Sequence, residues 1–234
     1  MSLSLRESAV ADALREQPVA RAAVTLGREV AIAVRAVGST RRFRRLRGQQ
    51  ELKVHLGCGA DVRRGWVNVD LAPEPREDAI VIAHDLRKGL PLESASCSLI
   101  YSSHFFEHLD YKAGVRLMRD CHRVLQHGGA LRFAMPNFRG MVEAYLRGDI
   151  TYLELVDIRE ALPYVEPGTE TIVDHVNYGV YQHGEHKTIY DEEKLSVILR
   201  AIGFSTVTES SFNAEIDPDE PVRRRYSFYL EAVK

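Results

Sequence analysis

Apolar residues recur with two different spacings along residues 51–234, and the change of spacing predicts alternating strands and helices. Short strand-type runs are expected at residues 52–56, 66–70, 80–83, 97–101, 130–135, 204–208 and 226–233. Helical spacing predicts a helix over residues 111–126, which His127-Gly128-Gly129 should end. Asp191 is expected to cap a further helix that runs to Ile202. This alternation indicates an α/β fold, with a mostly parallel sheet covered by helices on both faces.

The first 50 residues differ in character from the rest. They predict a helix from about Ser8 to Val37, followed by five arginines within Arg41–Arg47. Ten arginines and four acids give this arm a charge of +6, whereas 21 basic and 29 acidic residues give the remainder −8. The arm is expected to pack on the body as a solvated helix, with peripheral contact to an anionic membrane or a homo-oligomer contact as the alternatives. The acidic body argues against nucleic-acid binding.

Composition excludes several classes of protein. A chain of 234 residues with 45% hydrophobic and 27% charged residues is typical of one globular domain, and not of a disordered chain. The longest uncharged apolar run near the N-terminus, residues 30–34, is far shorter than the roughly 20 residues of a membrane span. Cys58, Cys97 and Cys121 are expected to be reduced thiols. We therefore expect a cytoplasmic protein without a signal peptide.

Glycines and carboxylates follow the predicted strands, where an α/β sheet binds its ligand. Gly57-x-Gly59 allows a ligand to approach the backbone, and Asp70 can accept two hydrogen bonds from ribose hydroxyls. A dinucleotide site would need a third glycine at position 62, which is Val62. The ten residues between Gly59 and Asp70 also leave little room for a phosphate-facing helix. The site therefore suits a ligand with ribose and no phosphate, such as S-adenosylmethionine.

The segment from residue 52 to the end resembles the class I S-adenosylmethionine-dependent methyltransferases, and more closely the small bacterial type with an LGCG…GWxNxD opening. The matching pieces are residues 54–59, 65–70, 85–86, 90–92, 101–109, 123–129, 186–187, 190–195 and 203–204. The resemblance implies a Rossmann-like fold with a seven-stranded sheet, S-adenosyl-L-methionine as cofactor and methyl transfer as activity. The short link between Gly59 and Asp70 departs from the broad class and leaves little room for the usual first helix.

The resemblance also implies a set of cofactor-binding residues, which are Gly57, Cys58, Gly59, Asp70, Leu71, Asp85, Leu86, Ser102 and Ser103. The two glycines would face the methionine part of the cofactor, and Asp70 would hold the ribose. Asp85, with the Leu86 backbone, would contact the adenine. The two serines would line the cofactor side of the fourth strand's end. The alternative for either aspartate is a turn or capping carboxylate, and the Cys58 side chain is expected to face the core.

Two histidines are the candidates for catalysis. Methyl transfer to a hydroxyl needs an aligned acceptor and removal of its proton, which suits histidine. His104 is the first candidate because it follows the fourth predicted strand, where acceptor-side residues lie in this class. His186 is the second, because it lies between the acceptor segment and the last helix. The alternative for either one is a polar pocket wall or a surface position.

Residues 104–108 read H-x-x-E-H, a string that also occurs in one class of zinc peptidases. His104, Glu107 and His108 could share one helical face and hold a metal. The string opens just after a strand in a methyltransferase-like frame, and no further ligand is marked out, so we do not expect a zinc-peptidase site. No metal is expected, but a site formed by these three residues stays open. A structural pair near the cofactor or the helix start is the alternative for Glu107 and His108.

Acceptor choice is expected to reside in residues 138–190. This segment combines aromatic, amide and imidazole side chains, namely Tyr145, Tyr152, Tyr164, Tyr178, Tyr181, His175, Asn177, Gln182, His183 and His186. Such side chains suit a polyhydroxylated ring, so O-methylation of a sugar or other glycan hydroxyl is the first expectation. An aromatic natural product is the alternative acceptor. A non-catalytic S-adenosylmethionine-binding scaffold is the alternative from a different class.

Overall fold

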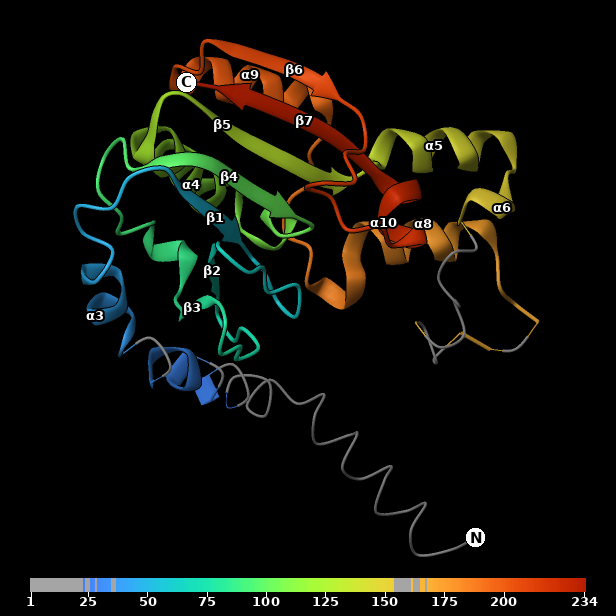
Figure 1. Ribbon diagram of the computed structural model, residues 1–234. Coiled ribbons are helices and arrows are strands. Elements are labelled where there is room, and N and C mark those ends of the chain that lie inside the picture. The colour runs from blue at the N-terminus through green and yellow to red at the C-terminus, as the bar shows by residue number, and fades with distance from the viewer. Residues whose placement is uncertain are drawn as a thin grey trace, which may run out of the picture.

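One central sheet organises the computed structural model, which describes residues 23, 26–27, 29–34, 37–153, 161, 165–166 and 168–234 (Figure 1). The strands are β1 (Leu52–Leu56), β2 (Val67–Asp70), β3 (Ile80–Ala83), β4 (Cys97–Ser103), β5 (Leu125–Pro136), β6 (Thr206–Ser210) and β7 (Ser227–Val233). The α-helices with described bounds are α3 (Ser39–Arg44), α4 (Tyr111–Val124), α5 (Phe138–Arg147), α6 (Ile150–Leu153), α8 (Ile172–Tyr181), α9 (Glu192–Ile202) and α10 (Pro221–Tyr226). Short 3-10 turns are η1 (Leu86–Lys88), η2 (Phe106–His108) and η3 (Gln182–Gly184).

The seven strands lie in the order β3-β2-β1-β4-β5-β7-β6. β1 to β5 pair in parallel, whereas β7 runs antiparallel to both β5 and β6. The chain moves outward from β1 to β3 and then returns to place β4 on the other side of β1. The strand order therefore reverses between β1 and β4, which is where open α/β sheets bind ligands. The prediction of a mostly parallel, seven-stranded Rossmann-like sheet is confirmed.

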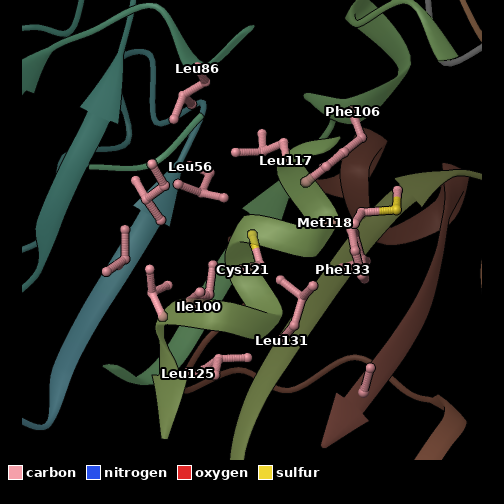
Figure 2. Close-up of a cluster of buried hydrophobic side chains, with 14 of the residues drawn as sticks. Leu56, Leu86, Ile100, Phe106, Leu117, Met118, Cys121, Leu125, Leu131 and Phe133 are labelled. Atoms are coloured by element: carbon pink, nitrogen blue, oxygen red, sulfur yellow. The ribbon is translucent and has the colours of Figure 1, made fainter. Parts of the chain in front are cut away.

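Helix α4 packs across the centre of one sheet face. Its buried residues Leu117, Met118 and Cys121 follow helical spacing, and Figure 2 shows them meeting side chains of β1, β4 and β5. The Asp110 side chain caps the helix by accepting a hydrogen bond from the Ala113 amide at 2.9 Å. Each large apolar side chain fully buried here contributes about 1.5–3 kcal/mol. This packing fixes the carboxyl ends of the three strands relative to one another.

The opposite sheet face is covered by loops at its centre. Arg63 lies over the Tyr101 ring, with its guanidinium carbon 4.3 Å from the ring centroid. The buried Arg132 of β5 pairs with Asp217 from the loop after β6. Residues 57–66 contain turns and no helix. The short link to β2 therefore removes the usual first helix, as expected, and loops bury polar side chains of this face.

Several predicted boundaries are wrong by a few residues. Helix α4 ends at Val124, because the backbone becomes extended at Leu125, so residues 127–129 do not form its stop. Gly128, with φ +76°, instead lies in the irregular start of β5. β4 continues to Ser103, and β6 begins at Thr206. The cap and end of α9 are confirmed, since Asp191 accepts a hydrogen bond from the Lys194 amide at 2.7 Å.

The arm joins the body through its last part. Ser39 begins α3, and Phe43 and Leu46 are buried in the same core cluster as the strands. The Arg42 guanidinium donates to the Val81 carbonyl at 2.9 Å. The predicted basic linker is thus a packed helix. Most of the predicted helix from Ser8 to Val37 lies outside the described residues. Within the described part of the chain, no helix is long and apolar enough to cross a membrane.

Candidate active site

The loop after β1 is built on two glycines in the left-handed region. Gly57 has φ +67° and Gly59 has φ +49°. A Cβ at position 57 would overlap the Phe105 side chain, so only glycine fits there. The Gly57 amide donates to the Val69 carbonyl at 2.8 Å, which ties the loop to β2. The predicted glycine positions therefore lie together at the carboxyl ends of β1 and β2.

Asp70, the last residue of β2, organises this loop. Its Oδ2 accepts a hydrogen bond from the Gly59 amide at 3.1 Å, and its Oδ1 accepts one from the Ala72 amide at 2.9 Å. Asp70 therefore does act as a turn carboxylate, which was the alternative to ribose binding. Each oxygen keeps a further acceptor position, and the residue is only half-buried, as is its neighbour Leu71. The carboxylate is thus held in place and remains able to bind hydroxyls.

Cys58 points into the core, as expected. It is 4% exposed, and burial raises the pKa of its thiol to about 12. The reactive form of cysteine is the thiolate, which a pKa this high disfavours. Cys58 therefore contributes its backbone and its packing to the loop, and not a nucleophile.

Asp85 lies at the end of β3 and is already engaged by an arginine. Its carboxylate accepts hydrogen bonds from Arg87 N at 3.0 Å, Nε at 2.9 Å and Nη2 at 3.0 Å. Burial alone would raise the pKa of Asp85, but the bonds and charge of Arg87 hold it below its usual value. Arg87 also binds both carboxylate oxygens of Glu29 at 2.9 Å. Leu86 is buried next to these residues. The bridge from Arg87 to Asp85 and Glu29 was not predicted from the sequence.

The two predicted serines form the end of β4. Ser102 pairs with Leu56 of β1 and Phe133 of β5, so it lies level with the glycine loop. The Ser103 hydroxyl accepts a hydrogen bond from Arg223 Nη1 at 2.7 Å. Both serines are buried within the strand. The end of β4 is therefore linked to α10, more than 100 residues further along the chain.

His104 follows β4 in a left-handed backbone conformation, with φ +47°. Such a conformation costs a non-glycine residue about 1–3 kcal/mol and is common at functional sites. His104 Nε2 lies 2.7 Å from the Ser227 hydroxyl, and Nδ1 lies 3.7 Å from Glu107 Oε1. Burial first, then the charge of Arg223, lowers the pKa of His104 to about 3. The ring is therefore neutral near pH 7 and is a weak base there.

Glu107, which the sequence suggested only as a metal ligand or as one of a structural pair, is a buried carboxylate in this region. It is 2% exposed, and neither carboxylate oxygen has a hydrogen-bond partner. Burial raises the pKa of this carboxyl to about 8. The Glu107 backbone carbonyl accepts hydrogen bonds from the amides of Lys187 and Thr188, at 2.7 and 3.2 Å. Those bonds bring the segment around His186 against η2.

His186 completes the group. Its Nδ1 lies 3.1 Å from the Gly179 carbonyl, and burial lowers the pKa of the ring. The rings of His108 and His186 pack edge to face, with centroids 4.9 Å apart. Glu107, His108 and His186 each offer a ligand atom within 4.8 Å of the other two. We predicted that residues 104, 107 and 108 share one helical face. His104 lies outside η2, so this prediction is wrong, and His186 is the residue that joins Glu107 and His108.

A cavity of about 350 Å³ unites the predicted catalytic histidines. His104, Glu107, His108 and His186 line it, as do Tyr178 of α8 and Arg223 of α10. Figure 1 shows α5, α8 and α10 gathered beyond the carboxyl ends of β4 and β5. Of the predicted acceptor segment, His175 and Gln182 also line the cavity, whereas Tyr145 and Tyr181 are exposed and Tyr164 lies outside the described residues. The volume suits a small-molecule ligand.

Comparison with protein families matches residues 54–133 to the model described as "Methyltransferase domain". That stretch runs from β1 into β5 and contains Gly57, Asp70, Asp85 and Ser102. It also contains His104 and Glu107, which line the cavity. No curated protein matches the chain.

Solved structures give weaker likenesses. A SAM-dependent methyltransferase from Archaeoglobus fulgidus is 18% identical, with 88% of this chain and 94% of that chain covered at a TM-score of 0.45. One from Mesorhizobium loti is 17% identical, with 82% and 95% covered at 0.44. A putative methyltransferase from Haloferax volcanii, solved with the Trm112 methyltransferase activator, is 14% identical, with 88% and 93% covered at 0.46. Likeness at this level identifies no acceptor.

Proposed function

We propose that this chain, a class I S-adenosylmethionine-dependent methyltransferase whose residues 54–133 match a methyltransferase domain, methylates a hydroxyl group of a sugar or a similar polyhydroxylated small molecule. The observation that carries the proposal is the cavity of about 350 Å³ beside the end of β4, with imidazole, phenol, amide and guanidinium groups in its wall. Such groups can donate to and accept from several hydroxyls at once. An aromatic natural product is the alternative acceptor.

The cofactor is proposed to lie along the ends of β1, β2 and β3. When bound, it supplies an electrophilic methyl group on a sulfonium sulfur. Gly59 has open space where a Cβ would lie and leaves room for the methionine part, whereas that direction at Gly57 is filled by the Phe105 side chain. The free acceptor positions of Asp70 suit the ribose hydroxyls. Leu71, Leu86 and the backbone of Cys58 complete the set. Asp85 would share its carboxylate between the adenine and Arg87.

The cofactor end and the cavity meet at Phe105. Its side chain lies directly against Gly57, and the residues on either side of it, His104 and Phe106, lead into the cavity wall and the core. Ser102 and Ser103 approach the same point from β4. In the proposed arrangement, a methyl group carried at Gly57 would lie beside Phe105, the residue that follows His104 of the cavity wall. This placement supports His104 and His186 as residues that contact the acceptor.

The two histidines are proposed to orient the acceptor by hydrogen bonding. Both rings have lowered pKa values and are neutral near pH 7. The Gly179 carbonyl holds the N–H of His186, which leaves its Nε2 lone pair for the acceptor, and Ser227 holds Nε2 of His104, which leaves its Nδ1. His104→Ala and His186→Ala should therefore lower turnover far more than cofactor affinity. The pKa of His104, at about 3, makes it a weaker base than the sequence analysis expected.

An acceptor screen with purified protein tests the proposed activity. Release of the demethylated cofactor would be followed over sugars, glycolipids and phenols, with His127→Ala as a control at an exposed histidine. Turnover with a sugar acceptor is the expected result. Turnover with phenols alone would replace the sugar with the aromatic alternative. Cofactor binding by calorimetry without turnover on any class would favour the non-catalytic scaffold.

The arm is proposed to make peripheral contact with an anionic membrane. Leu26, Val30, Val34 and Val37 are exposed, with Val37 81% exposed, and Arg44, Arg45 and Arg47 follow them on the surface. Each arginine near an anionic leaflet contributes about 1 kcal/mol. Sedimentation with anionic vesicles at low salt should fall when these three arginines become glutamine. A change of mass in light scattering without vesicle binding would favour a homo-oligomer contact instead.

A further inference from the structure

We propose that Glu107, His108 and His186 form a binding site for one divalent metal ion of the zinc class in the wall of the cavity. Two imidazoles and a carboxylate are a ligand set that zinc and related first-row ions use in catalytic centres, where three protein ligands leave a position open. Binding of the ion concerns these three side chains alone. The role of the ion in methyl transfer rests in addition on the proposed function.

The Glu107 carboxylate is the observation that points to a ligand. It is 2% exposed and lines the cavity, yet neither oxygen has a hydrogen-bond partner. Buried polar groups are almost always paired, and an unpaired one calls for an unseen partner such as an ion. His104 Nδ1 is 3.7 Å from Oε1, which is too far for a hydrogen bond. A cation between the carboxylate and the two imidazoles would supply the missing partner.

The hydrogen bond of His186 prepares its ring for a metal. A carbonyl oxygen can only accept, so the 3.1 Å contact with the Gly179 carbonyl places the ring hydrogen on Nδ1. The Nε2 lone pair is therefore left for a ligand bond. Metal-binding histidines are usually oriented in this way by a backbone carbonyl or a carboxylate on the other ring nitrogen. The feature distinguishes His186 from a histidine that merely lines a wall.

The three side chains are held close before any ion binds. Their ligand atoms lie within 4.8 Å of one another. Ligand atoms of a tetrahedral zinc ion lie about 3.3 Å apart, so a closure of up to about 1.5 Å completes the site. The amides of Lys187 and Thr188, bonded to the Glu107 carbonyl, keep His186 and Glu107 in register during that movement.

The open coordination position would face the cavity and receive the acceptor hydroxyl. A bound hydroxyl loses its proton more readily because the ion stabilises the alkoxide. The proton leaves to solvent, the acceptor oxygen forms the bond to the methyl carbon, and the carbon–sulfur bond breaks with its electron pair remaining on sulfur. Such activation would remove the need for a side-chain base.

Metal binding to the full chain, purified without a histidine tag and stripped with a chelator, tests the site. Titration with Zn²⁺ by calorimetry should show one equivalent bound, and Co²⁺ should give the visible absorption of a low-symmetry site. Glu107→Gln and His186→Asn should each weaken Zn²⁺ binding at least about 100-fold and abolish the Co²⁺ bands. His127→Asn, at an exposed histidine, should leave both unchanged.

The outcomes separate this site from the proposed function. If the folded wild type binds no Zn²⁺ or Co²⁺, or if the two site variants bind as tightly as wild type, the metal site is wrong. S-adenosylmethionine binding, measured by calorimetry on the same samples, confirms that each variant is folded. Metal binding without methyl transfer to any hydroxyl acceptor would support the site and overturn the proposed function. Full turnover by stripped enzyme in chelator would overturn the role of the ion in catalysis.

Discussion

The cofactor end and the cavity differ in how far apart in the sequence their contacts lie. Gly57, Gly59 and Asp70 come from one short stretch, and the bond from the Gly59 amide to Asp70 spans 11 residues. The cavity joins His104 to Ser227 across 123 residues and Ser103 to Arg223 across 120. The cofactor end is thus fixed by neighbouring strands. The cavity exists only when α8, α10 and β7 have closed over β4.

The carboxylates of the two regions differ in how many hydrogen-bond partners they have. Asp70 and Asp85 are held by backbone amides and by Arg87, so their positions are set before a ligand arrives. Glu107 is buried deeper and has no hydrogen-bond partner for its carboxylate. A preorganised carboxylate suits a ligand that every turnover requires. A carboxylate without a partner indicates that the cavity is complete only with something bound in it.

The largest expected effect is at the contact between the two regions. Gly57→Ala would place a Cβ in the Phe105 side chain at a φ of +67°. Left-handed strain and overpacking together should lower the free energy of unfolding by about 2–5 kcal/mol. Gly128→Ala is the matched control, since its φ is +76° but no heavy atom lies within 4 Å of the added Cβ. Urea unfolding measures both, and equal losses would show that the Phe105 contact is unimportant.

The next effect concerns cofactor affinity alone. Asp70→Ala should weaken S-adenosylmethionine binding by about 1–3 kcal/mol, because the ribose hydroxyls lose a carboxylate partner. Asp78→Ala is the control, since Asp78 pairs with Arg76 on the surface. Calorimetry compares the two variants. Unchanged affinity in Asp70→Ala would place the ribose elsewhere. Micromolar binding of NAD by the wild type would contradict the cofactor assignment itself.

A smaller effect depends on pH and tests the preorganisation of Asp85. Arg87→Gln should lower the free energy of unfolding near pH 7 by about 1 kcal/mol, a value reduced by the partial exposure of Arg87. The folded-state pKa of Asp85 is depressed, so this contribution is present above its unfolded pKa of about 3.9 and fades as pH falls below it. Urea unfolding at pH 7 and pH 3 checks it. A difference that persists undiminished at pH 3 would assign the effect to Glu29 or to packing.

The smallest expected effect is in the cavity. Ser227→Ala removes the partner of His104 Nε2 and should cost about 1 kcal/mol of stability. It should also raise the KM for the acceptor more than it changes cofactor affinity, because His104 loses its orientation. Ser205→Ala, at an exposed serine that donates to the Val233 carbonyl, is the control. A change in cofactor affinity alone would indicate that His104 contacts the cofactor and not the acceptor.

The sequence predicted where the proposed cofactor-binding residues lie in the fold, because the signals for these positions are local. Gly57, Asp70 and Asp85 each follow a strand whose apolar run is readable from the chain alone. The end of α4 was misjudged because Gly128-Gly129 looks like a stop, whereas the strand begins before it. The packing of Phe43 was missed because an arginine-rich segment indicates solvent, although its apolar residues face the core.

The cavity was only partly predictable. His104 and His186 were selected for their chemistry and their places in the chain, and the cavity contains both. The sequence suggested Glu107 only as a metal ligand on a helical face shared with His104 and His108, or as one of a structural pair. In the structure, His186 approaches it through backbone bonds from Lys187 and Thr188, a contact that no sequence spacing encodes. Arg223, which also lines the cavity, was not among the residues selected from the sequence.

The bridge from Glu29 through Arg87 to Asp85 connects the arm to the proposed adenine position. Thermodynamic linkage makes such a connection reciprocal. Whatever the docked arm does to the affinity for the cofactor, the bound cofactor must do by the same factor to the docking of the arm. If the proposed membrane contact broke this bridge and the break changed the affinity for the methyl donor, the concentration of methyl donor would in turn shift the share of the enzyme at the lipid surface.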